Sequence, residues 1–262
     1  MLSEILEELS NHPWKSQIHY FEEIDSTNNY AKTLANQGAP EGTIVIAEAQ
    51  TGGRGRMGRS FSSPACSGLY MSVILRPNCH PMELMHLTCA TGVAASNAIE
   101  RATGIRPSIK WTNDLVIGNR KLGGILTEMS VNPATQKVQW AVIGIGINCC
   151  QKSWQFPAEI RDIACSLNMN WLDTPPLFAA LIDALYIMCK QLFSDKTDIM
   201  EAFRTRCITI GQYVSILQGE QVRHGTAVGV DDEGGLIVQY ADGAFETVAS
   251  GEVSIRGMYG YL

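Results

Sequence analysis

The segment 52–59, GGRGRMGR, places three arginines and four glycines directly after the apolar run TIVIAEA. Glycine allows a backbone to approach a ligand closely and to point successive N–H groups at an anion. Arginine adds a fixed positive charge on a planar fork that matches a phosphate or a carboxylate. We therefore expect a loop that follows a buried strand and closes over a polyanion.

Other interpretations of this loop fit less well. Gly53-x-Gly55-x-x-Gly58 matches the dinucleotide-binding fingerprint, but that motif opens a helix and has an acidic residue about 20 positions later. Here the chain continues as SFSSPACSG, and Asn78 stands near the position of the acid. A Walker loop is excluded because no Gly-Lys-Ser/Thr follows. A basic loop that binds nucleic acid remains an alternative, which the net charge of −6 and the pI of about 5.4 disfavour.

A second group of candidates lies in the segments KWTND (110–114) and KLGGIL (121–126). Lys121 would begin a buried hairpin strand, where its charge can stabilise a carboxyl oxygen or an α-phosphate that becomes more negative during attack. Asp114 can help to hold Mg²⁺ or orient an incoming amine. The ordinary alternatives are that Asn113-Asp114 is a turn pair and that Lys121 is a surface lysine.

A third group lies in VIGIGIN (142–148), an apolar strand with alternating glycines that ends in Asn148. Glycine inside a strand marks a bulge or a close ligand contact, and a bend in the strand is the alternative. The segment Ser26-Thr27-Asn28 would begin a helix, and a helix cap alone accounts for it.

The composition is that of a packed globular protein, with 45% hydrophobic and 18% charged residues in a chain of 262. The first residues carry acids where a signal peptide has positive charge, and no uninterrupted apolar run approaches the ~20 residues of a membrane span. We therefore expect a soluble, cytoplasmic protein without a membrane segment. The eight cysteines form no C-x-x-C pair, so we expect all of them to be reduced and packed in the core.

The spacing of apolar residues predicts an α+β fold. Strands are expected at 18–23, 43–49, 69–75, in SIKW with DLVI, and at 121–130 and 137–148, and helices at 26–38, 83–102, 175–193 and around 198–206. The Gly118-Asn119 pair predicts a hairpin. From Gly211 onward, five short alternating segments indicate a small antiparallel barrel or sandwich. This change divides the chain into a catalytic domain, 1–210, and a C-terminal domain, 211–262.

Five motifs in this order closely resemble the biotin–protein ligases: DSTN (25–28), Gln50 with GGRGRMGR, KWTND, RKLGGIL (120–126) and GIGIN (144–148). The resemblance extends over residues 18–262. It implies a class II synthetase-like catalytic domain, in which helices flank a mixed β-sheet, followed by a small SH3-like β-barrel. It also implies two reaction steps. Biotin and Mg-ATP give biotinyl-5′-AMP and pyrophosphate, and a lysine ε-amine of a carrier protein then displaces AMP.

The resemblance also implies a role for each matching position. Biotin would contact Ser26, Thr27, Asn28, Gln50, Gly53, Arg54, Lys121, Gly124 and Gly144, and ATP would contact Arg54, Arg56, Arg59, Phe61, Asn113, Lys121 and Asn148. Lys121 would stabilise the transition states of both steps, while Arg54 and Arg56 would hold phosphates and order the loop over the adenylate. Asp114 is the remaining catalytic candidate and the candidate ligand for Mg²⁺. The division of roles among Asn113, Asp114 and Asn148 stays open.

The implied partner is the biotin carboxyl carrier protein domain of acetyl-CoA carboxylase or of another biotin-dependent carboxylase. Some members of the family carry an N-terminal helix-turn-helix domain, but 17 residues precede the first expected strand, so we expect no DNA binding. The resemblance is compatible with a homodimer. A lipoate–protein ligase, which shares the fold and the adenylate chemistry, is the alternative enzyme. The alternative outside the enzymes is a protein without catalytic activity, such as a vitamin sensor or an adaptor.

Overall fold

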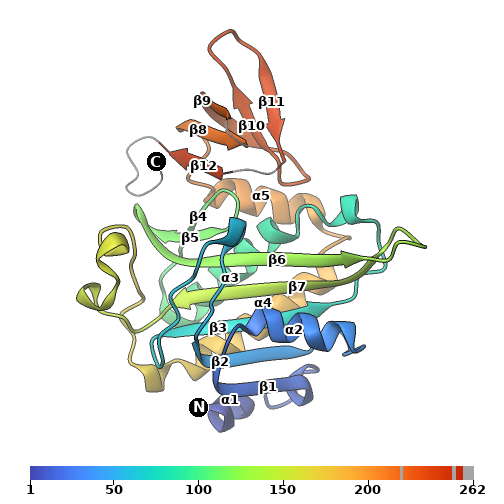
Figure 1. Ribbon diagram of the computed structural model, residues 1–262, viewed down its shortest axis with the longest axis vertical. Helices are drawn as coiled ribbons and strands as arrows, with labels where there is room; N and C mark the ends of the chain where they lie inside the picture. The colour runs from blue at the N-terminus through green and yellow to red at the C-terminus, as the bar shows by residue number, and fades with distance from the viewer. Residues whose placement is uncertain (219–220, 250–251, 256–262) are drawn as a thin grey trace.

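The computed structural model describes residues 1–218, 221–249 and 252–255, which form a seven-stranded sheet with helices on both faces and a five-stranded antiparallel sheet (Figure 1). The first part contains α1 (Leu2–Glu8), β1 (Ile18–Ile24), α2 (Thr27–Asn36), β2 (Ile44–Gln50), β3 (Gly68–Leu75), α3 (Leu87–Thr103), β4 (Ser108–Lys110), β5 (Asp114–Ile117), β6 (Arg120–Val131), β7 (Val138–Asn148), α4 (Pro175–Gln191) and α5 (Lys196–Arg206). The second contains β8 (Tyr213–Gln218), β9 (Gln221–Val230), β10 (Leu236–Gln239), β11 (Phe245–Val248) and β12 (Glu252–Ile255). The predicted α+β fold is confirmed.

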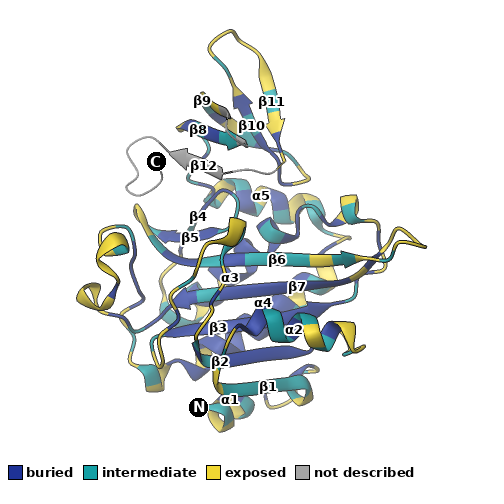
Figure 2. Cartoon of the chain, in the orientation of Figure 1, coloured by how far each residue is buried: buried dark blue, intermediate teal, exposed yellow. Residues whose placement is uncertain are grey.

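The large sheet has the strand order β1-β2-β3-β7-β6-β5-β4. It is mixed, because β1 and β2 run parallel while every other neighbouring pair is antiparallel. The central strands are buried on both faces (Figure 2), which explains their nearly continuous apolar sequences. SIKW and DLVI belong to two separate antiparallel strands, β4 and β5.

Helix α2 covers one face of the sheet together with the segment between β2 and β3 (Figure 1). Ser26 caps this helix by accepting a hydrogen bond from the backbone of Asn29. Its apolar side, Ala31 and Ala35, packs on Val45 of β2 and on residues of β3 and β7. This packing fixes the N-terminus of α2 above the middle of the sheet.

Helices α3 and α4 cover the opposite face (Figure 1). Helix α3 begins at Leu87, four residues later than the expected 83, because residues 81–84 form a separate 3-10 turn that His80 and Glu83 cap. Within the described ranges, one segment, Trp171–Gln191, is long and apolar enough to cross a bilayer, but 56% of it is buried inside the protein. That burial is expected of a core helix.

The five-stranded sheet, with the order β11-β10-β9-β8-β12, confirms the small C-terminal β domain. Its β9–β10 turn contacts the large sheet, since the indole Nε1 of Trp111 donates a hydrogen bond of 2.8 Å to the carbonyl of Gly234. Arg204 of α5 donates to the carbonyl of Val230 at 2.6 Å and forms an ion pair with Asp232. The boundary expected between 210 and 211 falls between α5 and β8, and residues 256–262 of the second range lie outside the described part.

The cysteines are all free, as expected. Five are buried, and Cys150 and Cys189 are half-buried. The expectation of core packing is wrong for Cys66, which is exposed in the segment that leads into β3.

Candidate active site

A single cavity collects most of the predicted site residues on the α2 face of the sheet. Its volume is about 140 Å³, and the space that it encloses together with its open mouth is about 990 Å³. Its walls come from the N-terminus of α2, the end of β2, the loop 54–61, and parts of β4, β5, β6 and β7. The predicted residues that line it are Ser26, Thr27, Asn28, Gln50, Arg54, Arg56, Arg59, Phe61, Asn113, Asp114, Lys121, Gly124 and Gly144.

One end of the cavity is a cluster of hydrogen-bonding side chains, in which Thr27, Asn28 and Ser72 are buried and Gln50 is half-buried. The backbone N–H and the hydroxyl of Thr27 both donate to Oε1 of Gln50, at 2.9 and 3.1 Å. The hydroxyl of Ser72 lies 2.8 Å from that of Thr27 and 2.6 Å from Oδ1 of Asn28. These contacts hold Thr27, Asn28 and Gln50 in defined orientations, as a site that recognises a polar ring requires. Ser72 was not predicted, because nothing in the sequence of β3 distinguishes it from a core serine.

Two glycines of β7 make room for neighbouring side chains. A Cβ atom on Gly144 would lie 2.0 Å from Oδ1 of Asn28, and one on Gly146 would lie 2.6 Å from the ring of Phe61. β7 pairs with β3 and β6 in unbroken register through both positions, so these glycines form no bulge. Their function in this chain is to admit Asn28 and Phe61 to the cavity wall.

The other end of the cavity contains an ion pair. Nζ of Lys121 lies 2.7 Å from Oδ1 of Asp114, whose side chain is only 8% exposed. Nδ2 of Asn113 lies 3.2 Å from the same carboxylate oxygen and 3.2 Å from the carbonyl of Ile125. Lys121 is therefore an ordered group of the cavity and not a lysine extended into solvent. Lys110, which was not singled out, is 2% exposed, lines the cavity and pairs with Asp114 in the β4–β5 register.

The arginine–glycine loop crosses the face of the sheet toward β5 (Figure 1). Nη1 of Arg56 donates to Oδ1 of Asn113 at 3.0 Å, which joins the loop to the far wall of the cavity. The loop contains a 3-10 turn, Arg56–Gly58, which the hydrogen bond from Arg59 N–H to the Arg56 carbonyl closes at 3.1 Å. Gly55 N–H also donates to the Arg59 carbonyl at 2.7 Å, across the loop. No helix follows the loop, so the dinucleotide fingerprint is accidental, as predicted.

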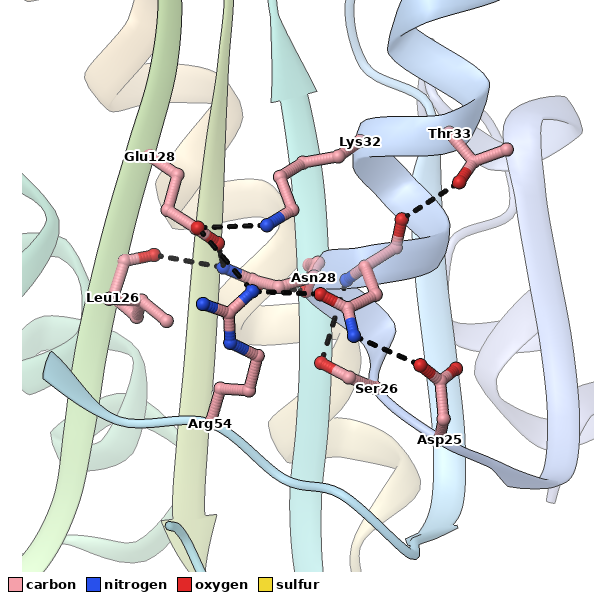
Figure 3. A network of polar contacts seen from close by, with 10 residues as sticks. Asp25, Ser26, Asn28, Lys32, Thr33, Arg54, Leu126 and Glu128 are labelled. Atoms are coloured by element: carbon pink, nitrogen blue, oxygen red, sulfur yellow. Dashed lines mark hydrogen bonds and ion pairs between the residues drawn. The ribbon is translucent and has the colours of Figure 1, made fainter. Parts of the chain in front are cut away.

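Arg54 contacts a polar network whose central residue, Glu128, lies outside the motifs (Figure 3). Its Nη1 donates to Oδ1 of Asn29 at 2.9 Å and lies 3.7 Å from Oε1 of Glu128. The same carboxylate accepts hydrogen bonds from Lys32 at 2.8 Å and from Asn28 at 3.0 Å. Burial raises the pKa of Glu128, but the hydrogen bonds from Lys32 and Asn28 and the nearby positive charges outweigh it, so the pKa lies below its ordinary value.

Two predicted residues do not line the cavity. A Cβ atom on Gly53 would lie 2.3 Å from the carbonyl of Phe61, so the glycine allows two backbone segments to pack together. Asn148 is 6% exposed at the end of β7, where its Nδ2 donates to the carbonyl of Cys165 at 3.0 Å. Asn148 therefore fastens the segment after β7 to the sheet.

Metal binding by the protein alone is not favoured. In the described ranges, no group of three or more His, Cys, Asp and Glu side chains could hold a metal ion. Among the residues that the structure describes, Asp114 is the one carboxylate that lines the cavity.

The sequence matches two family descriptions in succession. Residues 20–148 match the Biotin/lipoate A/B protein ligase family, and residues 209–256 match the Biotin protein ligase C terminal domain. The bifunctional ligase/repressor BirA of Bacillus spizizenii is 38% identical over 232 residues, which are 86% of this chain and 70% of that protein. The biotin–[acetyl-CoA-carboxylase] ligase of Mycobacterium tuberculosis is 29% identical over 249 residues, which are 92% of this chain and 89% of that protein.

Solved structures agree with the sequence matches. A biotin protein ligase from Aquifex aeolicus in complex with biotin and ATP superimposes with a TM-score of 0.74 at 30% identity, over 92% of this chain and 98% of that one. The fold and the cavity thus define a ligase domain of the Biotin/lipoate A/B protein ligase type. The C-terminal match is specific to the biotin ligases, so the chain belongs to the biotin protein ligase family.

Proposed function

We propose that this chain is a biotin–protein ligase that activates biotin with ATP and transfers the biotinyl group to a lysine of a carrier protein. One observation carries the proposal: a single cavity joins the hydrogen-bonding cluster of Thr27, Asn28 and Gln50 to the Lys121–Asp114 ion pair, beside an arginine-rich loop. The first end suits a polar ring, and the second suits a carboxylate that meets a phosphate. The Aquifex relative is described as bound to both biotin and ATP.

In the first step, a carboxylate oxygen of biotin attacks the α-phosphorus of ATP, and the bond from that phosphorus to pyrophosphate breaks. Negative charge grows on the phosphate oxygens and the leaving group, and the cations Lys121, Arg54 and Arg56 stabilise it. Because these cations are held by Asp114, Glu128 and Asn113 beforehand, little reorganisation is needed when the substrates bind.

In the second step, the neutral ε-amine of a carrier lysine attacks the acyl carbon of biotinyl-5′-AMP. The bond from that carbon to the AMP oxygen breaks, AMP leaves, and the amine loses a proton. Asp114 is the carboxylate of the cavity wall, as far as the chain is described, that can orient this amine. Until the carrier arrives, the loop anchored by Arg56 to Asn113 keeps water away from the adenylate.

We also propose that Mg²⁺ binds to the site together with ATP. The ion neutralises phosphate charge and is usually held by one or two carboxylates together with the substrate phosphates. The cavity fits that arrangement, because Asp114 supplies one carboxylate and the described part of the chain places no further acidic residue on the wall. Asp114 would contribute to Mg²⁺ binding only when it exchanges its contact with Lys121.

Biotin is favoured over lipoate by the polar end of the cavity. A dithiolane ring has no ureido group and would leave Thr27, Asn28 and Gln50 without partners on the ligand. This discriminates strongly where the groups are buried, as Thr27 and Asn28 are. Incubation with ATP and either acid, followed by trapping of the acyl-AMP and measurement of pyrophosphate, tests the assignment. Pyrophosphate release that depends on lipoate and not on biotin would refute it, and release with neither acid would favour a sensor or an adaptor.

The proposed partner is a biotin carboxyl carrier protein domain, such as that of acetyl-CoA carboxylase, and the proposed location is the cytoplasm. Relatives named biotin–[acetyl-CoA-carboxylase] ligase support this partner. We propose a homodimer that does not bind DNA. The net charge of −6 supports the absence of DNA binding, and a sequence-specific footprint on DNA would contradict it.

A further inference from the structure

Glu128 of β6, which lies outside the five sequence motifs, is the centre of a polar network (Figure 3). Its side chain is 25% exposed. Oε1 accepts a hydrogen bond from Nζ of Lys32 at 2.8 Å and lies 3.7 Å from Nη1 of Arg54, while Oε2 accepts from Nδ2 of Asn28 at 3.0 Å. Three groups of α2 and of the arginine–glycine loop therefore converge on one carboxylate.

The contact with Asn28 determines the orientation of a side-chain amide. A carboxylate can only accept hydrogen bonds, so it faces the NH₂ end of Asn28, which also lies 3.4 Å from the carbonyl of Leu126. The oxygen end then accepts from the hydroxyl of Ser72 at 2.6 Å and lies beside Gly144. A rotation of the amide by half a turn would place its NH₂ group against Gly144 and its oxygen against Glu128.

We propose that Glu128 is a positioning residue, which selects the orientation of the Asn28 amide and thereby sets the affinity for biotin. The inference rests on the proposed function, since Asn28 belongs to the cluster assigned to the ureido ring. It adds to that function a residue outside the cavity wall that determines which end of Asn28 the ligand meets.

The neighbouring Lys32 makes the inference testable. A glutamine at position 128 has the same shape but one acceptor oxygen and one NH₂ group. The charged Lys32 forms the stronger hydrogen bond and takes the oxygen, which turns the NH₂ group toward the NH₂ of Asn28. E128Q therefore expels or rotates the Asn28 amide. With methionine at position 32, the glutamine oxygen is available to Asn28 again.

Isothermal titration of biotin into the full-length wild type, E128Q, K32M and the K32M/E128Q double variant tests this logic. We expect the Kd for biotin to rise at least about tenfold in E128Q, to stay within about threefold of wild type in K32M, and to return to within about fivefold in the double variant. E246Q is the matched control, because Glu246 also accepts hydrogen bonds, from Arg223 at 2.6 Å and Tyr240 at 3.0 Å, in the C-terminal sheet.

The rescue distinguishes orientation of Asn28 from a general loss of structure, because a second destabilising change cannot restore binding. Wild-type affinity in E128Q, or a double variant no better than E128Q, would overturn the inference. Absence of biotin binding by the wild type would overturn the proposed function itself.

Discussion

Replacing Gly144 by alanine tests the close packing of β7 against the N-terminus of α2. The added Cβ would lie 2.0 Å from Oδ1 and 2.7 Å from Cγ of Asn28, far inside van der Waals contact. Asn28 is 4% exposed and cannot move into solvent without giving up its contacts with Ser72 at 2.6 Å and Glu128 at 3.0 Å. The substitution therefore breaks both contacts.

The cost follows from these contacts. A neutral hydrogen bond adds about 1 kcal/mol to the free energy of unfolding, and a hydrogen bond to a charged group adds about 1.5–3 kcal/mol. Alanine in place of glycine within a strand stabilises the fold by roughly 0.5–1 kcal/mol, which offsets part of the loss. The free energy of unfolding of G144A should thus fall by about 1.5–3.5 kcal/mol. Biotin binding should weaken by about tenfold or more, since one hydrogen bond to the ring is lost.

Gly124 supplies a matched control on the neighbouring strand. A Cβ there would lie 3.5 Å from Nζ of Lys121, an ordinary contact, so G124A should leave the free energy of unfolding unchanged or slightly higher. Urea denaturation and calorimetric titration of biotin measure both quantities. Equal free energies of unfolding for G144A and G124A would refute the reasoning. They would mean that the Asn28 side chain moves away from the new Cβ without any loss of stability.

Three further predictions concern the ion pair, the loop and the core. K121A should raise the barrier to adenylate formation by ~2–4 kcal/mol, measured as biotin-dependent pyrophosphate release, and near-normal turnover would remove Lys121 from the mechanism. R56G should bind biotin normally but lose its contact with Asn113 and release biotinyl-AMP, seen as indiscriminate labelling of lysines; full retention would contradict this. Burial lowers the pKa of His86, whose Nε2 lies 2.9 Å from the Leu192 carbonyl and whose Nδ1 has no hydrogen-bond partner among the described residues. The folded protein therefore favours the neutral imidazole, so its stability is fully present above the ordinary pKa of about 6.5 and falls as the pH drops through the lower pKa of the folded state. The melting temperature should therefore fall between pH 7.5 and 5.5, and H86Q should show a smaller fall; an identical fall in both proteins would exclude His86.

Much of the fold follows from local sequence patterns. β2 and β3 are mostly apolar, with Glu48 and Gln50 as the polar residues of β2 and Ser72 as that of β3. β7 is an apolar run interrupted by small or polar residues, so the burial of all three strands could be predicted directly. The short helix α1, Leu2–Glu8, was not predicted, because with seven residues it gains its stability from packing on α4 and not from its own sequence.

The motifs of the candidate site could be predicted from the sequence, but the contacts between residues of different segments could not. Lys121 and Asp114 follow from residue type and from the hairpin between them. The pairing of Asn28 with Glu128 joins residues 100 positions apart, and only the strand order brings them together. The position of Asn148 could not be predicted either: its Nδ2 donates to the carbonyl of Cys165 and the residue does not line the cavity, so its contact with ATP stays a prediction.

The hydrogen bond from Trp111 to the carbonyl of Gly234 has a consequence for chimeric proteins. Trp111 is part of the cavity wall. The β9–β10 turn, which belongs to the C-terminal sheet, therefore supports this wall from outside through its hydrogen bond with the indole. A C-terminal domain grafted from a relative must supply a backbone carbonyl at the same place, or the indole is buried without an acceptor. Swapping the two parts therefore requires that this turn be transplanted with its geometry intact.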